Sequence, residues 1–112
     1  MSQITTHILD TSRGLPAAGV KVQLLQQEDG RWILMTVGET NNDGRIGQWA
    51  DQSEVSAGQY KLVFDTAGYF SKCDVETFYP SVEILFLVTS DNQHYHVPLL
   101  LNPFGYSTYR GS

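Results

Sequence analysis

Three side chains in this sequence combine residue types that could carry out acid–base chemistry: His7, Arg45 and His96. A histidine titrates near neutral pH and can act as a general base, while an arginine stays charged and can hold a carbonyl or a developing negative charge. The sequence alone does not show that these three side chains lie close together in space. Taken singly, a strand histidine is usually a hydrogen-bonded or surface residue, and an arginine after a turn is usually solvated.

His94 adds a second possibility, because His94 and His96 are two residues apart on one predicted strand. That spacing places both imidazoles on one face, where His7 could serve as a third zinc ligand. The pattern is weak, since any two-residue spacing on a strand satisfies it, and we expect no functional metal. The sequence also contains no glycine-rich phosphate loop, no recognisable Ser-His-Asp context and no paired-carboxylate signature.

The elements that must position these side chains are short strands, predicted from alternating apolar and polar residues and from turn signals between them. Asn41-Asn42-Asp43-Gly44 is a strong turn directly before Arg45. A helix of one to three turns is predicted after Asp65, which can act as its N-cap, through about Lys72. The predicted strands cover 3–9, 20–25, 32–37, 45–49, 59–64 and 82–88, followed by two strands that meet at Asn102-Pro103.

Eight short strands with a turn every eight to twelve residues are typical of an antiparallel sandwich, and 1–112 is predicted to form one domain. In the strand 82–88 the inward set is Val82, Ile84, Phe86 and Val88, yet the opposite face holds Leu85 and Leu87. Apolar residues on both faces favour a sheet covered by a second subunit, and the alternative is a cover formed by a loop or by the short helix.

Composition limits the classes of partner. The net charge of −5 and the scattered Lys and Arg residues argue against a nucleic-acid binder and a polybasic membrane patch. Cys73 is the only cysteine, which fits a reducing compartment, and we expect it to be a buried bystander. The first six residues lack the basic and apolar regions of a signal peptide, so a cytoplasmic location is expected.

The C-terminal end is rich in tyrosine and carries Arg110 and the Ser112 carboxylate. Terminal residues are commonly disordered unless something holds them. We therefore predict that the second C-terminal strand runs to the last residue and packs against another part of the structure. This packing indicates that the C-terminal end takes part in an active site or in subunit assembly.

Four separated stretches, in order, resemble the transthyretin-related 5-hydroxyisourate hydrolase family. They are Ile4-Thr5-Thr6-His7-Ile8-Leu9-Asp10-Thr11 with Gly14-Leu15-Pro16-Ala17, then Thr40-Asn41-Asn42-Asp43-Gly44-Arg45, then His94-Tyr95-His96-Val97-Pro98-Leu99-Leu100-Leu101, and finally Tyr109-Arg110-Gly111-Ser112. The resemblance extends over essentially the whole chain, and four collinear motifs are far more specific than one.

The resemblance implies a transthyretin-like sandwich of two four-stranded antiparallel sheets with one short helix, assembled as a homotetramer, a dimer of dimers. It implies hydrolysis of 5-hydroxyisourate, the product of urate oxidation, to 2-oxo-4-hydroxy-4-carboxy-5-ureidoimidazoline, without a cofactor. The family's catalytic residues fall on His7, Arg45 and His96, and its substrate-binding residues on His7, Arg45, Tyr109, Arg110 and Ser112. Either histidine could be the general base, with His7 favoured.

Two other functions remain open at this stage. A transthyretin-like carrier of a small aromatic ligand would share the fold, but it would not need His7, Arg45, His96 and the Tyr109–Ser112 ending. A zinc-dependent hydrolase using His7, His94 and His96 would lose its activity on treatment with a chelator.

Overall fold

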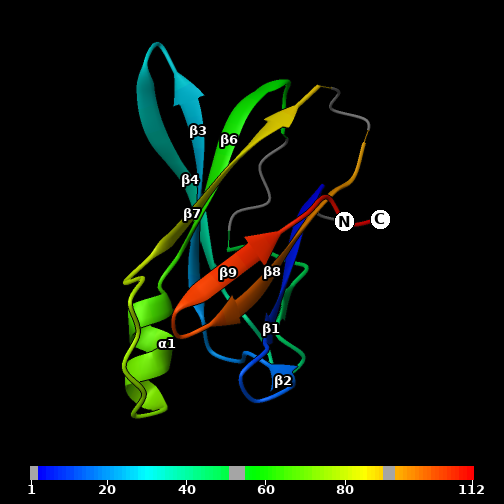
Figure 1. Ribbon diagram of the computed structural model, residues 1–112. Coiled ribbons are helices and arrows are strands. Elements are labelled where there is room, and N and C mark those ends of the chain that lie inside the picture. Colours follow the sequence, from blue (N-terminus) through cyan, green and yellow to red (C-terminus); the bar gives the residue numbers. More distant parts are fainter. Residues whose placement is uncertain (1–2, 51–54, 90–92) are drawn as a thin grey trace.

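The computed structural model describes residues 3–50, 55–89 and 93–112. Within them the chain forms short strands and one helix (Figure 1). The elements are β1 (Ile4–Asp10), β2 (Leu15–Pro16), β3 (Lys21–Glu28), β4 (Arg31–Glu39), β5 (Arg45–Ile46), β6 (Gly58–Phe64), α1 (Thr66–Lys72), β7 (Val82–Val88), β8 (Tyr95–Asn102) and β9 (Gly105–Thr108). No helix in these ranges is long and apolar enough to cross a membrane.

The strands form two sheets that face each other. One is antiparallel throughout, in the order β4-β3-β6-β7. The other, which we call the β1-β8 sheet, has the order β2-β1-β8-β9, and β5 pairs with β1. The predicted transthyretin-like sandwich is confirmed, with two differences: the β1-β8 sheet has five strands, and β1 and β8 run parallel. Between β1 and β8 the chain passes through the other sheet, so β8 can run in the same direction as β1.

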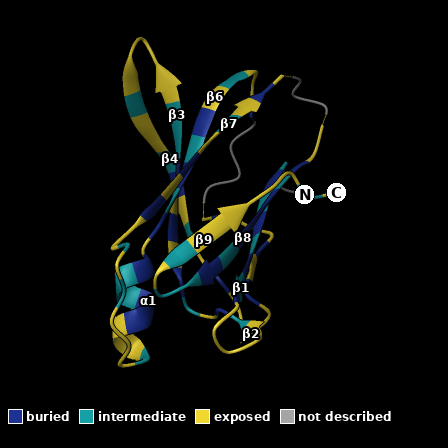
Figure 2. Ribbon diagram, viewed as in Figure 1, coloured by how far each residue is buried: buried dark blue, intermediate teal, exposed yellow. Residues whose placement is uncertain are grey.

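The core lies between the two sheets and follows from the alternation of the strands (Figure 2). On β1 the side chains of Ile4, Thr6 and Ile8 are buried, while Thr5 and His7 are half-buried on the opposite face. Thr6 satisfies its buried hydroxyl by donating to the carbonyl of Val97, 2.6 Å away. Because the strand period is two, burying the isoleucines fixes Thr5 and His7 on the outer face of the β1-β8 sheet.

Helix α1 begins and ends where the sequence predicts. The Asp65 carboxylate caps it by accepting a hydrogen bond from the amide of Gly68 at 3.0 Å. Tyr69 and Phe70 bury their rings against the core, and Cys73, expected to be buried, is half-buried and packs beside it.

Two predicted strands are shorter than expected. β5 ends at Ile46 because the chain then turns to bury Trp49, whose indole Nε1 donates to the carbonyl of Ile4 at 2.8 Å. β9 ends at Thr108, and beyond it only an isolated bridge joins Gly111 to His96. The C-terminal end is therefore held, as predicted, but not by a continuous strand.

The apolar outer face of β7 stays open within the chain. Leu85 and Leu87 are 61% and 60% exposed, whereas Val82, Ile84 and Val88 on the inner face are buried. Neither the helix nor a loop in the described ranges covers the two leucines, so that alternative is wrong. A covering second subunit stays a prediction.

Candidate active site

Arg45 is held by the tight turn that the sequence predicts. The Asn41 side-chain oxygen accepts hydrogen bonds from the amides of Asp43 and Arg45, at 2.9 and 3.0 Å. Gly44 closes the turn with φ +74° and donates to the Asn41 carbonyl at 2.9 Å. Its own carbonyl accepts from the amide of Ile8 at 2.8 Å, which fixes Arg45 beside β1.

Replacing Gly44 with alanine is expected to destabilise the protein by about 1–3 kcal/mol, because the backbone there is left-handed and an added Cβ would lie 2.5 Å from the Ile8 carbonyl oxygen. Urea unfolding at one fixed protein concentration measures the change. Gly47→Ala is the matched control, since nothing lies within 4 Å of a Cβ at that position. Equal midpoints for the two variants would contradict this role for Gly44.

His7 lies directly opposite Arg45 in the β1–β5 pairing, so both side chains leave the same face of the β1-β8 sheet. Partial burial, followed by the nearby Arg45 charge, lowers the pKa of His7 below its usual 6.5. A main-chain hydrogen bond with Asp43 and the Asp43 charge act in the opposite direction on that pKa. The net effect favours the neutral imidazole, the form that can accept a proton.

His96 projects from the same face, opposite Thr5 in the parallel β1–β8 register. The Thr5 hydroxyl lies 2.8 Å from Nδ1 of His96 and 3.0 Å from Nε2 of His94. The two imidazoles stack, with centroids 6.4 Å apart. Burial, then Arg45, then the other two histidines lower the pKa of His96. The neutral form is favoured here as well.

The C-terminal tail folds back onto His96. The amide of Gly111 donates to the carbonyl of His96 at 2.8 Å, and a Cβ at Gly111 would overlap Cδ2 of the His96 ring. Only glycine allows this close approach. Arg110 donates to the Gln93 side chain at 3.0 Å and lies over the Tyr95 ring.

These groups surround a cleft of about 290 Å³, which we call the histidine cleft. It brings together Arg45, His96 and Ser112 from three distant parts of the sequence, with the neighbouring residues Thr5, Thr6, Ile46, Gly47 and His94. His7 is not among the lining residues, but it is Arg45's strand partner and lowers the pKa of His96, so it adjoins the cleft. Tyr109 and Arg110 line a second cavity of about 310 Å³ beside β7 and β8, and His96 lines both this cavity and the histidine cleft.

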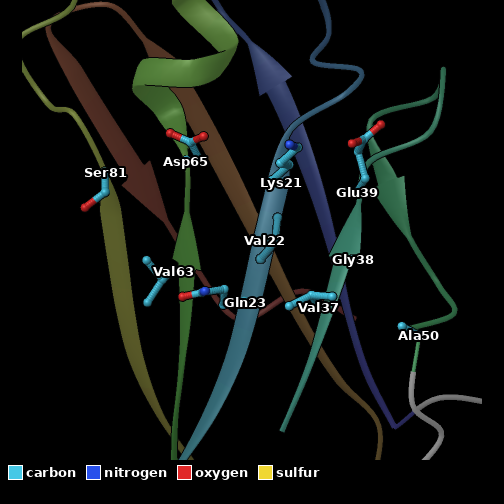
Figure 3. A pocket seen from close by; sticks show the side chains of 10 residues that line it. All are labelled: Lys21, Val22, Gln23, Val37, Gly38, Glu39, Ala50, Val63, Asp65 and Ser81. Carbon is cyan, nitrogen blue, oxygen red and sulfur yellow. The ribbon is translucent and has the colours of Figure 1, made fainter. Parts of the chain in front are cut away.

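A hollow larger than the histidine cleft, about 730 Å³, lies elsewhere (Figure 3). It covers the outer face of the β4-β3-β6-β7 sheet, where Lys21, Glu39 and Asp65 surround a floor that includes Val37 and Val63. No histidine lines it. The volume of a cavity therefore does not identify the candidate site. The site is identified by the titratable side chains that cluster at the histidine cleft.

A metal site is not evident from the placement of possible ligands. Over 3–50, 55–89 and 93–112, no three His, Cys, Asp or Glu side chains lie close enough together to hold an ion. His94 and His96 do lie side by side, but both share the Thr5 hydroxyl. The alternative zinc trio of His7, His94 and His96 is thus not assembled among the described residues.

Comparison with known proteins decides the family. The family model described as HIUase/Transthyretin family matches residues 4–111. The chain belongs to this family. A mouse 5-hydroxyisourate hydrolase is 45% identical over 113 residues, covering 99% of this chain and 96% of the mouse protein.

Solved structures show the same relationship. The structure of Klebsiella pneumoniae 5-hydroxyisourate hydrolase matches with a TM-score of 0.85 at 36% identity, covering 99% of this chain and all of that one. Sea bream transthyretin in complex with thyroxine matches with a TM-score of 0.90 at 31% identity, over 97% and 94% of the two chains. Since the fold is common to hydrolase and transthyretin, the site residues must distinguish them.

Two residues of the site, Thr5 and Gly111, were not among the site residues predicted from the sequence. Thr5 is one of several β-branched residues in a strand, and only the register places its hydroxyl between two histidines. Gly111 belongs to the recognised ending, but its contact with His96 depends on how the tail folds back.

Proposed function

We propose that this protein hydrolyses 5-hydroxyisourate in urate catabolism, opening the six-membered ring to give 2-oxo-4-hydroxy-4-carboxy-5-ureidoimidazoline. The observation that carries the proposal is the convergence of Arg45, His96 and Ser112 on one cleft, with His7 opposite Arg45 on the adjoining strand. The proposal is supported by relatives that are named 5-hydroxyisourate hydrolase and are similar to this chain over nearly its full length.

The chemistry follows from the residue types. A neutral imidazole of His7 or His96 takes one proton from water as its oxygen attacks the ring carbonyl, which contributes roughly 10²–10⁴-fold. Arg45 holds the carbonyl edge by a forked contact and stabilises the oxygen as it becomes negative. The carbon–nitrogen bond then breaks, and the leaving nitrogen takes the proton back from the imidazolium. Ser112 lies at the cleft and helps to complete it. No step needs a cofactor.

The rate should depend on pH in one direction. Because the pKa of His7 and that of His96 are both lowered from 6.5, either base is mostly neutral at pH 6.5 and becomes protonated below it. We expect a plateau above pH 6.5 and a falling rate below it, as the base becomes protonated. Initial rates corrected for spontaneous decay at each pH measure this, and a flat profile down to pH 5 would argue against a histidine base.

The fold also supports the proposed homotetramer, a dimer of dimers. β7 and β9 are edge strands of the two sheets, so each presents unpaired backbone groups. The second cavity, on this side of the molecule, is lined by Leu85 and Leu87 from β7 and by Tyr109 and Arg110 from the tail. Association along this side would cover the exposed leucines and place Tyr109 and Arg110 at a subunit boundary, near the substrate site that we propose.

The product distinguishes this function from that of a carrier. Urate labelled with ¹³C, oxidised in situ by urate oxidase, should yield the ureidoimidazoline signals in ¹³C NMR spectra faster when the protein is present. A carrier, which the similarity to the thyroxine-bound sea bream structure makes the second candidate, would leave the rate of product formation unchanged or lower it by sequestering the substrate.

A further inference from the structure

The hydroxyl of Thr5 has no part in the mechanism above, yet it lies between two imidazoles. Oγ1 is 2.8 Å from Nδ1 of His96 and 3.0 Å from Nε2 of His94. The contact is built into the fold, because Thr5 and His96 are directly paired across β1 and β8. All three side chains line the histidine cleft.

A threonine hydroxyl has a single proton, so it can donate to only one of two neighbours and must accept from the other. The tautomers of the two neutral rings are therefore linked. If Nδ1 of His96 carries a proton, the Thr5 oxygen accepts a hydrogen bond from it. The Thr5 hydroxyl then donates its own hydrogen bond to Nε2 of His94, which must be unprotonated. If Nδ1 of His96 is unprotonated, both hydrogen bonds reverse: the Thr5 hydroxyl donates to Nδ1 of His96 and accepts from a protonated Nε2 of His94.

The charge in the cleft selects between the two directions. Nδ1 of His96 contacts the Thr5 hydroxyl, so Nε2 is the nitrogen left for a contact within the cleft that His96 and Arg45 both line. The guanidinium is permanently positive, so it favours a lone pair over an N–H dipole at that nitrogen. A lone pair on Nε2 requires the proton on Nδ1.

We propose that Thr5, supported by His94, is a positioning residue that holds His96 in the Nδ1–H tautomer and leaves Nε2 free to accept a proton from water. The inference rests on the proposed hydrolase function and narrows the choice of base towards His96. The chain runs from His96 Nδ1–H to Thr5 Oγ1 and from the Thr5 hydroxyl to His94 Nε2. Thr5 and His94 act only through His96.

The test is ¹⁵N NMR of the ring nitrogens, which reports the tautomer directly and is simple to assign because the chain has three histidines. In the wild type at pH 7.5, His96 should show a protonated Nδ1 and an unprotonated Nε2. Thr5→Val removes the hydroxyl at nearly constant shape, and it should shift His96 towards the other tautomer. Thr5→Ser keeps the hydroxyl and should keep the wild-type spectrum.

Two further variants sharpen the test. His94→Phe keeps a stacking ring but removes the acceptor, so it should shift His96 in the same direction as Thr5→Val. Thr11→Val is the matched control, because the Thr11 hydroxyl bonds the Leu101 carbonyl at 3.2 Å and touches neither histidine. A protonated Nε2 in the wild type, or an unchanged tautomer in Thr5→Val, would overturn the proposal.

Kinetics separates this proposal from the proposed function. Thr5→Val should lower kcat by about tenfold, the factor that one neutral hydrogen bond is worth, with KM little changed. Thr5→Ser and Thr11→Val should stay near the wild-type kcat. If the wild type does not accelerate hydrolysis, the proposed function fails, while the NMR result still decides whether Thr5 sets the tautomer of His96. An active wild type with an unaffected Thr5→Val variant would contradict only the role of Thr5.

Discussion

Replacing His96 with alanine is expected to lower the rate of 5-hydroxyisourate hydrolysis by at least about a hundredfold, the lower limit for losing a positioned general base. The fold should survive, because His96 is half-buried on the outer face of the β1-β8 sheet and its backbone pairing with β1 does not depend on the ring. His7→Ala should cause a loss of similar size, since His7 lies opposite Arg45 and adjoins the same cleft.

Initial rates above the spontaneous decay, together with thermal unfolding of the same samples, check this expectation. If the melting temperatures are unchanged, a lower rate reports the loss of the histidine side chain and not the loss of the fold. Near-wild-type turnover in either folded variant would remove that histidine from the mechanism.

Deleting Arg110 to Ser112 is expected to abolish activity with little loss of stability. Arg110 and Ser112 are exposed and Gly111 is half-buried, so the tail adds little apolar burial to the core. However, Ser112 lines the histidine cleft, and Gly111 is hydrogen-bonded to the backbone of His96. Removing the tail should therefore open the cleft on one side and free the His96 ring.

The steady-state rate and the melting temperature of the truncated protein check this, and a large drop in melting temperature would indicate a packing role instead. Gly111→Ala is a finer version of the same test, because its Cβ would displace the His96 ring or the tail. Gly105→Ala is its matched control, since the nearest atom to an added Cβ there is 3.7 Å away.

Much of the fold could be predicted from local patterns. The alternation in β1 placed Ile4 and Ile8 inside and His7 outside, and Asp65 marked the start of the helix. The parallel pairing of β1 with β8 could not be predicted in this way, because it joins residues 91 positions apart and no local signal indicates the direction of a partner strand.

The site shows the same division. The turn predicted at Asn41–Gly44, directly before Arg45, is confirmed, and hydrogen bonds with Asn41 and Ile8 hold it in place. The approach of Arg45 to His7 and His96 depends on β5 pairing with β1 and β1 with β8. The placement of Tyr109 and Arg110 in the neighbouring cavity, away from Arg45, could not be inferred from their adjacency to Ser112 in the sequence.

The most direct measurement of the central claim is the decay of 5-hydroxyisourate, generated in situ from urate by urate oxidase, with and without the protein. Spontaneous decay is the background, and the Arg45→Ala variant is run at the same concentration. We expect clear acceleration by the wild type and its loss in Arg45→Ala, because Arg45 lines the histidine cleft and is the residue that we propose to stabilise the developing oxyanion. A folded wild-type protein that leaves the decay unchanged would contradict the hydrolase function and favour a small-ligand carrier.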